Sequence, residues 1–137
     1  MKRRMFLLAA LAVLLVAMLA TAAVAAAPTT VQLQPVNNSG VTGTVVLTPQ
    51  SPSGTHIDVT AAGLSPGKRY VSLTYGNHDC ALERYSTKDI IGRPYMANMS
   101  GDGHVSGDVP DNLDQINSVS VRQGYFKLLA CADVHPG

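Results

Sequence analysis

The sequence predicts an all-β domain of eight short strands, folded as a β-sandwich or a flattened barrel. Most segments after residue 27 alternate apolar and polar residues, as strands with one buried face do. Clusters of Gly, Pro and Asn separate these segments at the spacing of turns. No segment of this region keeps a helical period, which favours a sandwich or barrel over a mixed fold.

The first three strands are expected at residues 31–34, 41–48 and 55–61. Asn37-Asn38-Ser39-Gly40 ends the first, and the Pro- and Gly-rich residues 49–54 end the second. In the third, Thr55, Ile57, Val59 and Ala61 share one face, whereas His56, Asp58 and Thr60 share the other. This pattern predicts a strand with one buried and one exposed face.

Residues 69–75 are expected to form the fourth strand, followed by the longest loop, residues 76–93. The strand has one face of Val71, Leu73 and Tyr75 and another of Tyr70, Ser72 and Thr74. We interpret the serines and threonines of the strands as outward-facing residues. The loop contains Cys80.

Four more strands are expected in the remaining sequence. Residues 95–100 and 104–109 flank Gly101-Asp102-Gly103, a pattern typical of a hairpin. Residues 116–122 and 126–132 form the last predicted pair, joined by Gln123-Gly124-Tyr125.

The N-terminus has the plan of a secretory signal peptide. A basic segment, residues 2–4, precedes an apolar run from Met5 to Ala20 and a tail of small residues up to Ala27. We expect a signal peptide at 1–27, cleaved near 25–27, and one domain at 28–137. A retained membrane anchor is the alternative, because the apolar run approaches the length of a membrane-spanning helix. The short, alanine-rich signal is typical of a bacterial protein.

Charge excludes some partners. Three of the 10 Lys and Arg lie in the signal, so 7 remain against 9 Asp and Glu, a net charge near −2. Without a basic run, a nucleic-acid partner is not expected. No long apolar segment follows the signal, so we expect no membrane span after cleavage and a final location in the periplasm, in the cell wall or outside the cell.

The chain has two cysteines, Cys80 and Cys131. An even number in an exported protein favours a disulfide, with two separate buried thiols as the alternative.

Several segments together resemble the Cu,Zn superoxide dismutase family over nearly the whole mature chain. They are Gly40–Val45, Gly63–Gly67, the Asn-x-x-x-Asp-Gly segment at 98–103, and Leu129–Cys131. The resemblance implies a Greek-key fold and a disulfide between Cys80 and Cys131, which occupy the positions of that family's intrasubunit disulfide.

The same resemblance implies that the metal sites are degenerate. Ser72 and Thr74 stand where the copper strand has its two histidines, and Arg122 stands at the last copper histidine. Tyr95 occupies the position of the zinc aspartate. Hydroxyls are weak copper ligands, and a guanidinium repels a cation. We therefore expect no cofactor.

The alternative is a copper-binding protein, or a superoxide dismutase, with rearranged ligands. His78, Asp79 and His104 are the candidate ligands, with His135 as a further one. Such a site needs three or four converging donors. A hydrolase built on Ser72, His78 and Asp79 is not favoured, because no nucleophile elbow is present.

Tyrosines suggest a contact surface. Tyr85, Tyr95 and Tyr125 lie in or beside loops, where a ring offers apolar area and a hydroxyl a polar tip. The alternative is that they fill the space of the lost metals. We expect a secreted, non-catalytic module that binds another protein or a cell-envelope component, and the sequence leaves a homodimer open.

Overall fold

The computed structural model describes residues 26–136 and confirms the all-β prediction. Two short 3₁₀ turns, η1 (Thr87–Asp89) and η2 (Leu113–Gln115), interrupt the loops. The strands are β1 (Thr29–Pro35), β2 (Thr42–Pro49), β3 (Thr55–Ala62), β4 (Arg69–Tyr75), β5 (Tyr95–Met96), β6 (Gly103–Val109), β7 (Ser118–Gln123) and β8 (Lys127–Asp133). The predicted signal peptide lies almost wholly outside the described residues.

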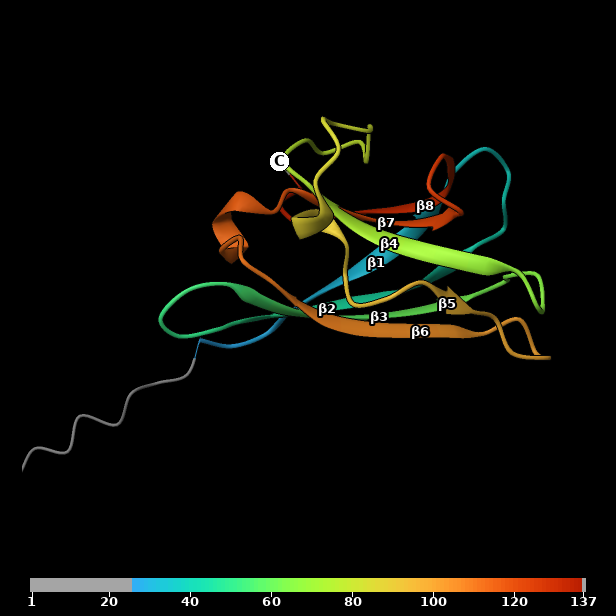
Figure 1. Cartoon of the computed structure of the whole chain (residues 1–137), viewed down its shortest axis with the longest axis horizontal. Coiled ribbons are helices and arrows are strands. Elements are labelled where there is room, and N and C mark those ends of the chain that lie inside the picture. Colours follow the sequence, from blue (N-terminus) through green and yellow to red (C-terminus); the bar gives the residue numbers. More distant parts are fainter. Residues whose placement is uncertain (1–25, 137) are drawn as a thin grey trace, which may run out of the picture.

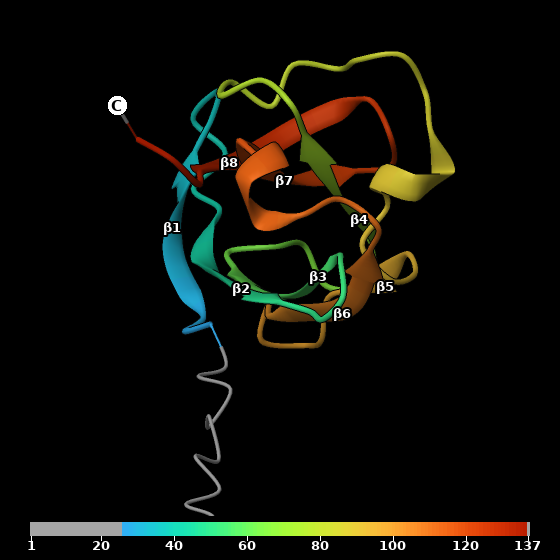
Figure 2. The same cartoon turned by 90° about the vertical axis from the view of Figure 1, so that its left-hand side faces the viewer.

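The strands form one antiparallel, nearly closed sheet in the order β5-β4-β7-β8-β1-β2-β3-β6. β1, β2 and β3 are consecutive neighbours, whereas β3 also pairs with β6 and β4 with β7, so the chain crosses between the layers as a Greek key does. Figure 1 shows one layer of β4, β7 and β8 above another of β2, β3 and β6, and Figure 2 shows the barrel from its end.

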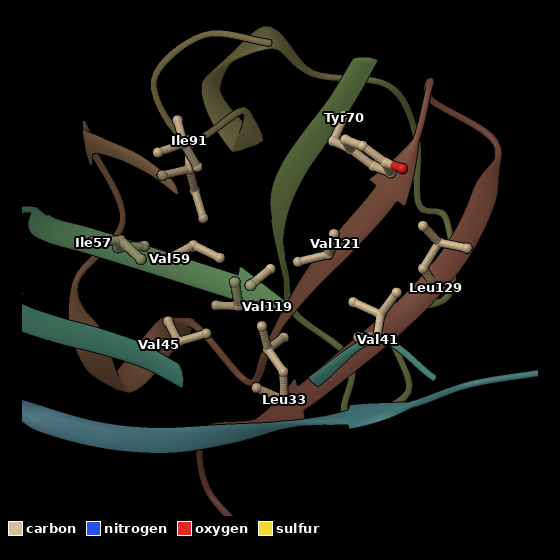
Figure 3. Close-up of a cluster of buried hydrophobic side chains, with 14 of the residues drawn as sticks. Leu33, Val41, Val45, Ile57, Val59, Tyr70, Ile91, Val119, Val121 and Leu129 are labelled. Atoms are coloured by element: carbon tan, nitrogen blue, oxygen red, sulfur yellow. The ribbon is translucent and has the colours of Figure 1, made fainter. Parts of the chain in front are cut away.

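The core fills the space between these layers (Figure 3). Alternate residues of each strand point inward, as in β3, where Ile57 and Val59 are fully buried and His56 and Asp58 are half-buried on the outside. Val45 of the neighbouring strand β2 and Val119 of β7, in the opposite layer, belong to the same cluster. The face assignment predicted for residues 55–61 is confirmed.

The predicted hairpin at residues 95–109 is wrong. β5 pairs with β4 and β6 pairs with β3, so the two segments lie at opposite ends of the sheet order. The turn itself is real: the Asn98 amide donates to the Asp102 carbonyl, 2.9 Å away. It connects β5, which pairs with β4, to β6, which pairs with β3.

The expectation that strand serines and threonines face outward is also wrong for β4 and β7. Ser72, Thr74, Ser118 and Ser120 are all buried. β4 is covered on both sides: Tyr70 packs into the main core, whereas Val71, Leu73 and Tyr75 form a second apolar cluster. We call the side of Val71, Leu73 and Tyr75 the outer face of β4. Residues 76–94 cover this outer face. The alternation of apolar and polar residues in β4 therefore did not distinguish buried residues from exposed ones.

Within residues 26–136, no helix has the length and apolar character needed to cross a membrane.

Candidate functional site

The loop over the outer face of β4 is attached by a disulfide. Cys80, fully buried, is bonded to Cys131 of β8, which confirms the predicted pairing. Ser118 fixes the start of the loop, because its hydroxyl donates to the Asn77 carbonyl at 2.6 Å and accepts from the Cys80 amide at 3.2 Å. Further along, the Ile91 amide donates to the Ser72 carbonyl at 2.9 Å. The loop is thus tied to β4, β7 and β8.

Arg122 lies beneath this loop and joins three parts of the structure. It is only 3% exposed. Its Nε donates to the Tyr75 hydroxyl at 2.7 Å, its Nη1 to the Phe126 carbonyl at 2.9 Å, and its Nη2 to the Cys80 carbonyl at 2.6 Å. One guanidinium therefore connects β4, the turn between β7 and β8, and the disulfide.

This arrangement holds a buried cation without an anion. Within the described residues, every ion pair involves a histidine, and no carboxylate lies within 4.0 Å of Arg122. Carbonyls, the Tyr75 hydroxyl and the Tyr75 ring, whose centroid lies 5.8 Å from the guanidinium carbon, share the charge instead. Burial raises the pKa of Tyr75, with the hydrogen bonds from Ser120 and Arg122 opposing it. Tyr75 therefore stays neutral as a partner of Arg122.

Above Arg122, aromatic side chains gather at the surface. The Tyr85 and Tyr125 rings meet edge to face, with centroids 5.3 Å apart, and the Tyr125 and Phe126 rings do the same at 5.2 Å. Phe126 is 81% exposed and Tyr85 61% exposed. Together with Leu82 they line a shallow groove of about 650 Å³. We call Leu82, Tyr85, Tyr125 and Phe126 the aromatic face.

The structure brings together two of the three tyrosines of the predicted contact surface. Tyr85 and Tyr125 belong to the aromatic face, but Tyr95 does not reach the surface. Tyr95 is buried, and its hydroxyl lies 2.8 Å from the Ser72 hydroxyl. Burial raises the pKa of Tyr95 to about 12. Tyr95 therefore fills the interior and adds nothing to a contact surface.

The three positions matched to copper ligands do not converge. Directly opposed residues of neighbouring strands share a face, and Ser72 lies opposite Val121, whereas Arg122 lies opposite Val71. Ser72 and Thr74 therefore point to one side of the sheet and Arg122 to the other. Moving the correspondence in β4 by one residue would place Val71 and Leu73 on the side of Arg122. Both are apolar, so no ligand pair stands there in either register.

The candidate histidines are likewise dispersed. His78 Nδ1 lies 2.7 Å from a carboxylate oxygen of Asp133, and His104 Nε2 lies 3.7 Å from Asp58. His135 contacts the Leu113 carbonyl, and the Asp79 amide is hydrogen-bonded to Asn77. Across the part of the chain that the structure describes, no three His, Cys, Asp or Glu side chains are grouped so that they could hold a metal.

Sequence reasoning missed Phe126 and Leu82. Phe126 was expected as the first residue of the last strand, where its side chain would point to one face of the sheet. The strand begins one residue later, at Lys127, and this leaves Phe126 in the turn. The available signal was two adjacent aromatic residues directly after Gly124. In the structure Gly124 has a φ of 59° and follows Gln123, the last residue of β7.

No protein-family model and no curated protein matches the chain. The resemblance to Cu,Zn superoxide dismutases therefore rests on the sequence segments quoted above, and it stays a prediction.

Proposed function

We propose that the chain is an extracytoplasmic, non-catalytic binding module that contacts a partner protein through the aromatic face. The observation that carries the proposal is the exposure of Phe126 and Tyr85 on a surface fixed from below. Large aromatic side chains are enriched in the centres of protein interfaces. An exposed, contiguous apolar surface on a small domain is also a frequent sign of a binding site.

The way the face is held supports recognition. The Phe126 carbonyl is bound by Arg122, and Arg122 also binds the loop that carries Leu82 and Tyr85. A surface that is already ordered loses less conformational entropy when a partner binds. The disulfide suits an oxidising environment, in agreement with the predicted export.

The buried hydroxyls offer no sign of catalysis. Ser72 is paired with Tyr95, and Ser120 with Tyr75. Neither lies in contact with a histidine in the described residues, so neither is placed as an activated nucleophile. A metal-dependent activity has no separate observation in its favour.

Photo-crosslinking in the producing cell tests the proposal. A benzophenone amino acid replaces Phe126 in one variant and Met99 in another. Met99 is the matched control, since it is 92% exposed but lies in the turn between β5 and β6. We expect a discrete protein adduct from position 126 and none from position 99. Equal adducts from both positions, or no adduct from position 126, would count against the aromatic face as a binding site.

A further inference from the structure

The charges of the mature chain are segregated. All 7 Lys and Arg beyond the signal lie in residues 68–93 or 122–127. Residues 94–121 contain four carboxylates and neither Lys nor Arg. Asp58 and Asp108 lie on β3 and β6, in the layer away from the aromatic face (Figure 1). The side with the aromatic face is therefore positive relative to the other.

Three exposed cations lie next to the aromatic face. Arg84 shares a small hollow with Leu82 and Tyr125. Arg69 lines an apolar groove together with Tyr125, and Lys127 lines the cleft at the barrel end together with Phe126. Among residues 26–136, no Lys or Arg lies within 4.0 Å of a carboxylate, so none of these three forms an ion pair there, although Glu83 and Asp89 line the same hollow as Arg84.

The orientation of the rings indicates what enters between them. The Tyr85 and Tyr125 planes differ by 62°, and those of Tyr125 and Phe126 by 84°. Rings at these angles do not form one flat platform, and they line a groove instead. An apolar side chain fits such a groove, and burying it against Phe126 removes apolar area from water.

Resting on the proposed function, we propose that the partner presents an acidic polypeptide segment with an apolar anchor. The anchor occupies the groove of the aromatic face, and the segment's carboxylates lie near Arg69, Arg84 and Lys127. This matches the usual interface plan, an apolar centre with a charged rim of complementary sign.

An anionic membrane surface fits less well. Glu83 lines the same groove, with its carboxylate held by the Asn77 amide at 3.0 Å. A fixed negative charge in the lining of the groove opposes lipid phosphates packed over the face. A polypeptide can place its carboxylates around Glu83, because its charges lie on separate side chains.

Fluorescence anisotropy with two labelled peptides tests the proposal on the exported, disulfide-bonded protein. Both peptides alternate Leu with a charged residue, which is Glu in one and Lys in the other. We expect the Glu peptide to bind at least about tenfold more tightly than the Lys peptide, with the preference shrinking as salt rises. Phe126→Ser should weaken its binding by about tenfold or more. Lys127→Glu should weaken it by a smaller factor.

Met99→Ser is the control and should bind as the unaltered protein does. Phe126→Ser should keep the unaltered melting temperature, so that its loss of binding is not a loss of fold. Equal binding of the two peptides, or none, would overturn the partner chemistry. If position 126 still crosslinks to a protein in that case, the proposed function stands and only the acidic segment is wrong.

Two further outcomes would also overturn the proposal of an acidic polypeptide segment. In the first, vesicles of phosphatidylglycerol bind the protein, and Phe126→Ser abolishes the binding, while the Glu peptide does not compete. In the second, the protein self-associates at low salt through Phe126, as sedimentation would show. The occupant would then be a membrane or a second copy of this chain.

Discussion

The two sides of β4 are both buried, but different forces bury them. On the inner side, Tyr70 and Ser72 meet the barrel core and Tyr95, and all the contacts are packing and neutral hydrogen bonds. On the outer side, Tyr75 lies under a loop that is held by a disulfide and a buried guanidinium. The inner side is closed by the barrel, whereas the outer side depends on two particular attachments.

The two sides of β4 therefore have different roles: the inner side stabilises the fold, and the outer side positions residues that are exposed. The inner side contributes to the core and carries nothing to the surface. On the outer side, burying the charge of Arg122 has a desolvation penalty, which hydrogen bonds must offset. In return the outer side orders the segment that carries Tyr85 and the turn that carries Phe126.

Reduction of the disulfide is expected to have the largest effect on stability and to open the outer side of β4 first. Reduction should lower the free energy of unfolding by about 4 kcal/mol, the chain-entropy value for a loop closed by partners 51 positions apart. The covering loop should open first, because Cys80 anchors it. Limited trypsin digestion of the reduced protein should cut after Arg84 and Lys88 before the barrel strands are cleaved. A melting temperature that reduction leaves unchanged, or a covering loop that trypsin does not cut, would contradict this difference between the two sides.

Replacing Arg122 should have the next largest effect. Arg122→Met removes the donor to three acceptors, the Tyr75 hydroxyl and the Phe126 and Cys80 carbonyls. We expect a loss of about 3 kcal/mol in denaturant unfolding, the usual scale for breaking a buried charged network. Ser72→Ala, the matched change on the inner side, should cost about 1 kcal/mol.

Arg122→Lys sharpens the result. An ammonium keeps the charge but cannot present three donors in the planar geometry that the acceptors require. It should therefore recover only part of the loss. If the methionine variant were as stable as the unaltered protein, Arg122 would not be the attachment that the structure indicates.

The sequence was sufficient to predict the strands but not how they are covered. Alternation placed β3 and both of its faces correctly, because one side of β3 faces the core and the other faces water. It failed for β4, where residues 76–94 cover the outer face. Periodicity reports which residues share a face, and it does not report whether a loop lies over that face.

The site was predicted in the same partial way. The disulfide followed from the number of cysteines and from the resemblance, and it is present. Tyr85 and Tyr125 are 40 positions apart in the chain, and their contact follows from the loop path, which no local pattern specifies. From the sequence, Arg122 was interpreted only as a residue at a copper-ligand position, where a guanidinium repels a cation. Its three acceptors come from separate segments, so its structural role could be seen only in the fold.

The smallest effect is a dependence of stability on alkaline pH, in which Tyr95→Phe isolates the contribution of the inner side. Burial raises the pKa of Tyr95 from 10.0 to about 12, partly opposed by the hydrogen bond from Ser72. Between these values the unfolded chain releases the phenol proton and the folded chain keeps it, so stability falls as pH rises. The full loss is about 2 to 3 kcal/mol, reached near pH 12, and no loss from this group is expected below pH 10. Burial also raises the pKa of Tyr75 on the outer side, which adds to the fall in stability as pH rises. Tyr95→Phe should therefore flatten the curve of unfolding free energy against pH without abolishing its slope. A slope that Tyr95→Phe leaves unchanged would mean that the inner hydroxyl pair is open to water.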